Sequence, residues 1–366
     1  MGSAALYHLA SRGIRAIGIE RFEPGHDRGS SHGDSRAIRL GYSEHPSYVP
    51  LVRSAFSNWR DLERRSGETL LTVTGILEAG KPGSRMVAGS LEACEAHQLE
   101  HEVLGAAEIG HRFPAFHLPE DYKAIWQPEG GFLRPDAANA AHLRLARESG
   151  ATIRTLTAVR VIEPGPGNVR LRLGDGVVEA GSVIVTTGPW IGDLVPVLRP
   201  HLSVTRQVLC WYQPRRPEVF APGALPVFMI EGADDILYGF PDFDGQGFKC
   251  GSHFGSGAVA HADLARQDAG PDDAARTRRF LEANMPSGAG RLLGMKTCMY
   301  TMTPDEDFVV DLMPGESRIV VASPCSGHGY KFASVLGEAL ADLATDGRTP
   351  HDLGRFRLDR FGAAGH

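Results

Sequence analysis

Hydrophobic residues recur along the chain at two spacings, and each spacing predicts one kind of secondary structure. Within residues 48–65, Val49, Val52, Phe56 and Trp59 follow one another at intervals of three or four residues, with arginines between them. This spacing predicts an amphipathic helix. Further helices are expected near residues 4–11, 86–96, 135–150, 274–284 and 333–346, and short apolar or alternating runs near residues 14–19, 70–78, 151–163, 168–190, 308–314 and 318–324 predict strands.

Longer alternating segments occupy the part of the chain after residue 200. They cover residues 203–214, 225–231, 235–243 and 247–254. Alternation over this length predicts an antiparallel sheet that buries one face and leaves the other free to line a cavity. Because helices and strands alternate on both sides of this region, the predicted fold class is α/β, with the sheet region inserted into it.

The first twenty residues have the order of the second half of a dinucleotide-binding βαβ unit. Gly2 is followed by an apolar helix, a second glycine at Gly13, an apolar strand and the acid Glu20. In such a unit the acid receives the ribose hydroxyls. The strand and the two glycines that would come before Gly2 are missing from this sequence, which amounts to about 14 residues. We therefore expect weak dinucleotide binding and an exposed edge at strand 15–19.

Composition and charge restrict the class of protein. With 366 residues, of which 42% are hydrophobic and 22% charged, the chain is long enough for two domains with cores of their own. A net charge of -6 gives no basic surface, so neither nucleic acid nor an acidic membrane is an expected partner. The five cysteines are an odd number without C-x-x-C spacing, which favours a reducing compartment. Since there is neither a membrane-spanning apolar run nor a basic leader, the expected location is the cytoplasm.

Two predicted loops contain side chains or backbone that could carry chemistry. In the first, residues 30–39, His32, Arg36 and Arg39 follow the ribose acid, and the alternative interpretation is a solvated basic turn. The second, residues 326–332, places two glycines between a strand and a helix, where the backbone can approach an anionic ligand at the helix N-terminus. The alternative there is an ordinary tight turn.

The predicted strands carry further candidates. Lys249 and His253 are an even number of residues apart, so they point to the same face of the sheet, near Tyr238 on the preceding strand. A buried lysine and histidine are costly without a function, and the alternative is that this face is exposed to water. Cys298 lies among apolar residues, where a single cysteine is most often an inert part of the core. No spacing of cysteines and histidines matches a metal site.

Six ordered segments together resemble one known family. They are residues 30–51, 130–138, 186–194, 238–254, 298–311 and 326–332, and they include SSHGDSRAIRLGY, GGFLRPDAA, TTGPWIGDL, YGFPDF with GFKCGSHF, CMYTMTPDEDFVVD and SGHGYKF. On these segments the chain resembles the monomeric sarcosine oxidase family, which also includes N-methyltryptophan oxidase and pipecolate oxidase. The resemblance covers nearly the whole chain.

The resemblance implies a fold with two domains. Residues 1–69, 131–200 and 305–366 would form a Rossmann-like FAD-binding domain whose first strand is absent from this chain. Residues 70–130 and 201–304 would form an inserted α+β domain with an antiparallel sheet, which binds the substrate. The resemblance also implies FAD that is linked covalently to the thiol of Cys298, in place of an inert thiol, and it implies no metal.

The resemblance also assigns roles to individual residues. Arg39 and Lys331 match the pair that binds the substrate carboxylate, with Tyr300 beside them, and two cations on one carboxylate fix the orientation of an amino acid. Lys249 matches the lysine that activates oxygen. The full catalytic set is Lys249, Arg36, His32, His253 and Tyr238, and the cofactor set is Gly2, Glu20, Arg21, Ser30, Ser31, His32, Arg36, Val159, Trp190, Cys298, Gly327, His328, Gly329 and Lys331.

The reaction implied by the resemblance is the oxidation of a secondary amine. FAD would oxidise sarcosine or another N-methyl or cyclic amino acid to an imine, which is then hydrolysed, and O2 would be reduced to H2O2. The expected partners are therefore a small amino acid and O2, and the expected state is a monomer. The alternatives are a flavin amino-acid dehydrogenase of the same fold with another acceptor, and a truncated chain with impaired FAD binding and no activity. Leu40, Gly41, Ser35 and Cys325 depart from the residues usual in the family, which leaves the identity of the amine open.

Overall fold

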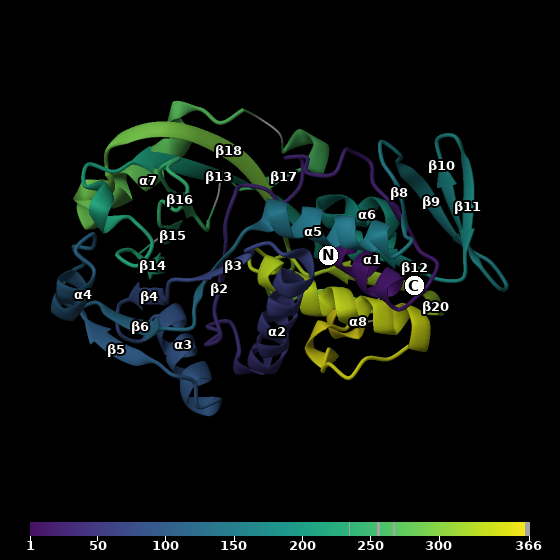
Figure 1. Ribbon diagram of the computed structural model, residues 1–366, viewed down its shortest axis with the longest axis horizontal. Helices are drawn as coiled ribbons and strands as arrows, with labels where there is room; N and C mark the ends of the chain where they lie inside the picture. Colours follow the sequence, from purple (N-terminus) through teal and green to yellow (C-terminus); the bar gives the residue numbers. More distant parts are fainter. Residues whose placement is uncertain (234, 255–256, 266–267, 363–366) are drawn as a thin grey trace.

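The computed structural model describes residues 1–362, with the exception of residues 234, 255–256 and 266–267. An extended, curved sheet lies on one side of the molecule, and helices from both ends of the chain lie together on the other (Figure 1). Every helix predicted from the periodicity is present. The helix α4 was not predicted, because its seven residues are too few to show a period. The α-helices are α1 (Gly2–Ser11), α2 (Val49–Ser66), α3 (Arg85–Ala96), α4 (Ala106–Arg112), α5 (Pro135–Glu148), α6 (Ile191–Leu194), α7 (Pro271–Asn284) and α8 (Ala333–Asp346).

The large sheet combines the predicted alternating segments with strands from the first third of the chain. Its order is β17-β13-β16-β15-β14-β4-β6-β5, and β18 pairs with β13. Neighbours are antiparallel except for β14 and β4, which run parallel. The predicted antiparallel sheet is therefore present, with one parallel pair added. The strands are β4 (Ile76–Gly80), β5 (Glu102–Gly105), β6 (Lys123–Gln127), β13 (Ser203–Gln213), β14 (Val227–Glu231), β15 (Ile236–Phe240), β16 (Phe248–Ser252), β17 (Ala258–Val259) and β18 (Arg291–Met302).

Four smaller sheets lie on the side of the helices. β1 (Ile17–Ile19) pairs in parallel with β8 (Thr152–Arg154), and β12 (Val183–Val185) pairs in parallel with β20 (Glu316–Ser323). Among the described residues β1 pairs only with β8, so its second edge is unpaired, as expected from the sequence. The remaining strands are β19 (Val309–Met313) beside β20, the antiparallel group β9 (Val159–Pro164), β10 (Val169–Leu173) and β11 (Gly176–Ala180), and the group β2 (Arg36–Ile38), β7 (Gly131–Leu133) and β3 (Leu71–Val73).

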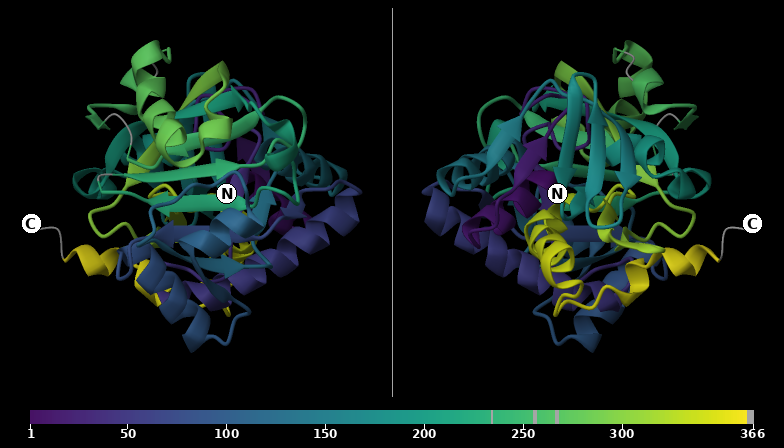
Figure 2. Two further views of the ribbon diagram at one scale, coloured as in Figure 1. Left: turned by 90° about the vertical axis from the view of Figure 1, so that its left-hand side faces the viewer. Right: turned by 90° about the vertical axis from the view of Figure 1, so that its right-hand side faces the viewer.

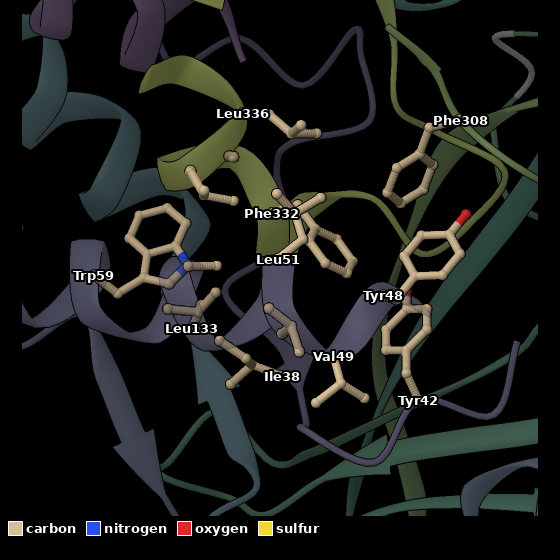
Figure 3. Close-up of a cluster of buried hydrophobic side chains, with 14 of the residues drawn as sticks. Ile38, Tyr42, Tyr48, Val49, Leu51, Trp59, Leu133, Phe308, Phe332 and Leu336 are labelled. Atoms are coloured by element: carbon tan, nitrogen blue, oxygen red, sulfur yellow. The ribbon is translucent and has the colours of Figure 1, made fainter. Parts of the chain in front are cut away.

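The largest apolar core lies between α2, α8 and the segments around residues 38–48 and 308 (Figure 3). Trp59 of α2 is fully buried in it, and its indole Nε1 donates a hydrogen bond to the carbonyl oxygen of Lys331 at 2.8 Å. Tyr42 and Tyr48 stack with ring centroids 4.7 Å apart. Burial of each such large side chain contributes about 1.5–3 kcal/mol, so this core fixes the segments that carry residues 39–44 and 328–332.

A second core lies under the large sheet and is formed by strands β4, β6, β13, β14 and β16 with α7. In the end views the strands that follow residue 200 form the upper half of the molecule, while α2, α3 and the C-terminal helices form the lower half (Figure 2). No helix in the described part of the chain is both long and apolar enough to cross a membrane.

The predicted strand over residues 70–78 is wrong, because the segment forms two strands in different sheets. β3 pairs with β7, and β4 pairs with β6 and β14. The break occurs at Gly75, whose φ of 71° lies in the left-handed region. A Cβ at this position would overlap the indole ring of Trp126. Alternation of side chains continues across the turn, so the pattern alone does not reveal that the chain changes sheet.

We expect Gly75→Ala to destabilise the protein much more than Gly13→Ala. Both glycines have positive φ, 71° and 75°, but nothing lies within 4 Å of a Cβ at Gly13. The left-handed conformation costs an alanine about 1–2 kcal/mol at either position, and the clash with Trp126 adds about 1–3 kcal/mol at position 75 alone. Unfolding in urea measures the difference. Equal losses of stability would contradict the role given to Gly75.

Candidate functional site

A large cavity of about 1510 Å³ separates the large sheet from the helical side of the molecule. Its volume exceeds the range of about 300–1,000 Å³ that is usual for one small ligand. The cavity is therefore large enough for a dinucleotide together with a second small molecule. The edges of β1 and β12 line one end, and side chains of β15, β18 and the 326–331 segment line the other.

The predicted dinucleotide residues line the first end of the cavity. Glu20 follows β1, and its Oε1 accepts a hydrogen bond from the backbone N–H of Phe22 at 2.9 Å. Gly2 opens α1, so the positive end of that helix dipole faces the cavity, where it favours an anionic group. The remaining predicted residues on this wall are Arg21, Val159 and Trp190.

Arg36 organises the loop over residues 30–36. Its guanidinium donates to the carbonyl oxygens of Ser35 and Ser30 at 2.8 Å each, and to that of His32 at 2.5 Å. Ser30 and Ser31 line the cavity, while the hydroxyl of Ser30 donates to the backbone of Met299 on β18 at 2.6 Å. The loop is thus folded around a cation and tied to the large sheet.

His32 lies behind this wall, not in it. The side chain is 4% exposed, and neither ring nitrogen has a hydrogen-bond partner among the described residues. Burial, reinforced by the nearby Arg36 charge, lowers the pKa of His32 to about 4, so the imidazole is neutral at physiological pH. Arg39 in the same segment is only 1% exposed. The alternative interpretation of this segment as a solvated basic turn is therefore wrong.

Cys298 lies on β18, opposite Gln207 of β13, and its thiol lines the cavity. Burial raises the pKa of Cys298, whereas the positive charges of Arg36 and Lys249 oppose that shift. The net shift of the pKa is upward, so the protonated thiol is the resting form, and Arg36 and Lys249 reduce the cost of forming the thiolate, the reactive form.

Lys249 is buried one layer behind the cavity wall. Its Nζ donates to the carbonyl oxygens of Gly33 and Ser35 at 2.7 Å each, and lies 4.3 Å from the ring centroid of Phe240. Burial, and then the charge of Arg36, lower the pKa of Lys249 well below its usual value. The side chain is 2% exposed, so the interpretation of this position as part of a water-exposed face is wrong.

His253, Tyr238 and Tyr300 line the second end of the cavity, against the backbone of Gly327. The rings of His253 and Tyr300 have centroids 5.4 Å apart. Gly327 has a φ of 81°, and a Cβ there would lie 2.7 Å from Tyr300 and 2.8 Å from His253. Only glycine allows the 326–329 segment to approach these rings, so this segment is more than an ordinary tight turn.

The two predicted carboxylate-binding cations both contact Tyr42. The guanidinium of Arg39 stacks 4.6 Å from the ring centroid, and Lys331 Nζ donates to the Tyr42 hydroxyl at 3.3 Å and to the His328 carbonyl at 2.7 Å. His328 Nδ1 in turn lies 2.5 Å from the same hydroxyl. Burial, and then Arg39, lower the pKa of Lys331 to about 7, and burial lowers that of His328 to about 4.

Two carboxylates that the sequence did not identify as site residues contact Arg39. Glu44 lies 2.7 Å from Nη2, and Glu78 of β4 lies 2.9 Å from Nε. Although burial opposes it, these two carboxylates raise the pKa of Arg39 further. The signal for Glu78 was present in the sequence as a charged residue within an apolar segment, but nothing in the sequence indicated its distant partner.

All five cysteines are free thiols, and no group of three or more potential metal ligands occurs among the described residues. His328 is close to Cys325 only through the backbone, since its ring nitrogens bond to Tyr42 and to the carbonyl of Glu306.

Comparisons with known sequences identify relatives over almost the full length. The family model for FAD dependent oxidoreductases matches residues 1–343. The chain is 38% identical to a monomeric sarcosine oxidase of Bacillus sp. (strain NS-129), covering 98% of this chain and 94% of that protein. It is 37% identical to a monomeric sarcosine oxidase of Streptomyces avermitilis, covering 100% and 96%. It is also 34% identical to the N-methyl-L-tryptophan oxidase of Yersinia pestis (strain Pestoides F), covering 99% and 96%.

Solved structures give the same picture of the fold. NikD, described as an unusual amino acid oxidase essential for nikkomycin biosynthesis, superposes with a TM-score of 0.84 at 26% identity, covering 97% of this chain and 94% of that chain. The L-proline dehydrogenase from P. horikoshii also has a TM-score of 0.84, at 19% identity, covering 98% and 94%. At that identity the likeness concerns the fold alone.

We expect the affinity of the Arg39–Lys331 end for a small carboxylate to fall as the pH rises through about 7. Below this pH Lys331 carries a positive charge and above it the charge is lost, whereas His328, with a pKa of about 4, stays neutral on both sides. Loss of one nearby charge weakens anion binding by roughly tenfold. Calorimetric titration with acetate across this pH range measures the step, and Lys331→Met is expected to abolish it. A step of the same size in that variant would exclude Lys331 as its source.

Proposed function

The chain belongs to the FAD dependent oxidoreductase family, as a relative of the monomeric sarcosine oxidases, and we propose that it oxidises the secondary amine of a small amino acid to an imine with reduction of O2 to H2O2. The substrate class is sarcosine or another N-methyl or cyclic amino acid, and water then hydrolyses the imine. The observation that carries this proposal is the convergence of Arg39 and Lys331 with Tyr238, His253 and Tyr300 at one end of a dinucleotide-sized cavity.

The residues around the cavity fit FAD. Gly2, Glu20 and Val159 line the end proposed for the adenosine and phosphates, and the close approach that requires glycine at position 327 provides a backbone wall for a flat ring. When bound, FAD supplies the acceptor for the two electrons that leave the amine. Cys298 is the proposed point of covalent attachment, because its thiol lines the same cavity with two cations nearby.

The side chains at the second end would bind and orient the amine. Arg39 and Lys331 would bind the carboxylate, which fixes the position of the adjacent C–N bond. Oxidation requires a neutral amine, because a protonated amine has no lone pair available. Arg36, which bonds to backbone carbonyls and not to a carboxylate, favours loss of the extra proton by like-charge repulsion. Burial lowers the pKa of His253, so this ring is neutral and can accept a hydrogen bond from the amine.

Lys249 is proposed to promote the reaction with O2. Its two hydrogen bonds to the carbonyls of Gly33 and Ser35 hold the amino group in one position behind the cavity wall. In this position it acts on the reacting groups through the intervening residues Ser35 and Arg36. A fixed hydrogen-bond donor close to a site where negative charge develops is a usual means of stabilising such a step.

The proposed domain division follows the cores. Residues 1–69, 131–200 and 305–366 contribute most of the core around α2 and α8, and residues 70–130 and 201–304 most of the core under the large sheet. β3 is the exception, since it pairs with β7 of the first part.

We further propose a monomeric protein of the cytoplasm, and the five free thiols support a reducing environment.

The function is tested by a peroxide assay on the protein supplied with FAD. Sarcosine, N-methyl-L-tryptophan, pipecolate and proline are offered separately, and at least one is expected to give one H2O2 for each O2 consumed. Lys331→Met serves as the matched variant and is expected to raise the KM for the preferred amino acid. Reduction of a dye without peroxide would identify a dehydrogenase instead, and failure to bind FAD would show that this chain does not support the reaction.

The covalent attachment is tested by acid precipitation. The wild-type pellet is expected to stay yellow, whereas Cys298→Ser is expected to release its flavin into the supernatant. Cys325→Ser is the control, because Cys325 also lines the cavity and its loss is expected to leave the pellet yellow. A colourless wild-type pellet would exclude a covalent link. A colourless Cys325→Ser pellet would show that the flavin is attached through Cys325 and not through Cys298.

A further inference from the structure

A carboxylate that no part of the proposed reaction uses lies behind the carboxylate-binding end of the cavity. Glu78 is on β4, a strand whose five residues are all buried, and its own side chain is 0% exposed. Ser90 Oγ of α3 donates to its Oε2 at 2.7 Å, and Gln127 Nε2 of β6 donates to the same oxygen at 2.8 Å. Arg39 Nε lies 2.9 Å from Oε1. Glu78 does not line the cavity and reaches it only through Arg39.

Burial raises the pKa of Glu78, and the polar groups that face it oppose that shift. The amide of Gln127 has a fixed orientation, because its oxygen accepts from the backbone N–H of Gly41 at 2.7 Å. Its NH2 group must therefore face Glu78. All three partners, Ser90, Gln127 and Arg39, thus present a proton or a positive charge to the carboxylate. Two hydrogen bonds and an adjacent guanidinium favour the ionised carboxylate and so oppose the effect of burial.

The two carboxylates on Arg39 differ in what they can do when a ligand enters. The Glu44 side chain is 19% exposed at the cavity wall, so it can withdraw in favour of an incoming carboxylate. Glu78 is enclosed on every side and cannot. Arg39 Nη1, which has no hydrogen-bond partner among the described residues, is left to meet the ligand. The charge of Glu78 therefore remains beside Arg39 whatever occupies the cavity.

We propose that Glu78 is a specificity-determining residue that weakens the carboxylate-binding end of the cavity by neutralising Arg39 from behind. The inference rests on the proposed function. The positive side chains of Arg39 and Lys331 are balanced by the carboxylates of Glu44 and Glu78 before a ligand binds. The site consequently holds the acid group of an amino acid loosely and accepts secondary amines whose acid group is esterified, amidated or absent.

The test compares the binding of a charged and an uncharged ligand of the same shape. Acetate and acetamide are titrated calorimetrically into the FAD-supplied wild-type protein and into Glu78→Gln, at one pH. Removal of a fixed negative charge near the ligand is expected to tighten acetate binding by about tenfold and to leave acetamide unchanged. Glu78→Leu, which removes the same charge without a polar replacement, is expected to act in the same direction if Glu78→Gln folds poorly.

A matched control separates this effect from the general charge of the cavity. Glu231→Gln removes a carboxylate that lines the same cavity and forms no ion pair with a described residue, since its Oε2 accepts from the backbone N–H of Met86 at 2.9 Å. This variant is expected to bind acetate as the wild type does. Tightening by the same factor in Glu231→Gln would show that long-range charge, not Glu78, sets the affinity.

Turnover provides a second readout that a purely structural role would not change. Glu78→Gln is expected to lower the KM for an N-methyl amino acid about tenfold, with kcat and the KM for its methyl ester unchanged. Weaker or unchanged acetate binding, or equal changes for acid and ester, would overturn the inference. If no amine is oxidised by the wild type but acetate binding still tightens in Glu78→Gln, the proposed reaction fails and the role of Glu78 stands.

Discussion

A guanidinium enclosed by protein must be paired, and the pairing of Arg39 joins the parts of this molecule. Transfer of a charged group out of water costs several kcal/mol even after relaxation, so Arg39 is stable only with its carboxylates in place. Those carboxylates come from different elements, Glu44 from the loop before α2 and Glu78 from the large sheet. The stacked ring of Tyr42 then connects Arg39 to Lys331 and His328. One buried charge thereby sets the positions of the helical side, the sheet and the 326–332 segment relative to one another.

The positive charge of Arg36 is stabilised in a different way. It lies three residues before Arg39, yet backbone carbonyls alone provide its hydrogen bonds to described residues. Carbonyl dipoles stabilise the cation without cancelling its charge. Its field therefore acts on both sides of the cavity wall: it adds to the effect of burial in lowering the pKa of His32 behind the wall, and it opposes the rise in the pKa of Cys298 in the cavity. The two arginines therefore differ in their surroundings, because Arg39 is paired with carboxylates and Arg36 is not.

The helices and the long strands could be predicted because their periods are set by local geometry. The site could be predicted less fully. Glu20, Trp190, His253 and Gly327 line the cavity as candidates, but Lys249 and His32 lie behind its wall. The type of a residue indicates which reactions its side chain could take part in. Packing alone decides whether that side chain lines the cavity or lies behind its wall. Glu78 was not predicted as a partner of Arg39 because 38 intervening residues and a change of sheet separate the two, and no local pattern carries that information.

The hydrogen bond from the Trp59 indole to the Lys331 carbonyl has a consequence for variation among related sequences. Through this bond, the apolar packing of α2 against α8 helps to set the position of Lys331 in the cavity. Interior substitutions that slide one helix along the other would carry that amino group with them. Preference among acids can therefore drift through changes of core volume alone, in residues that never touch a ligand.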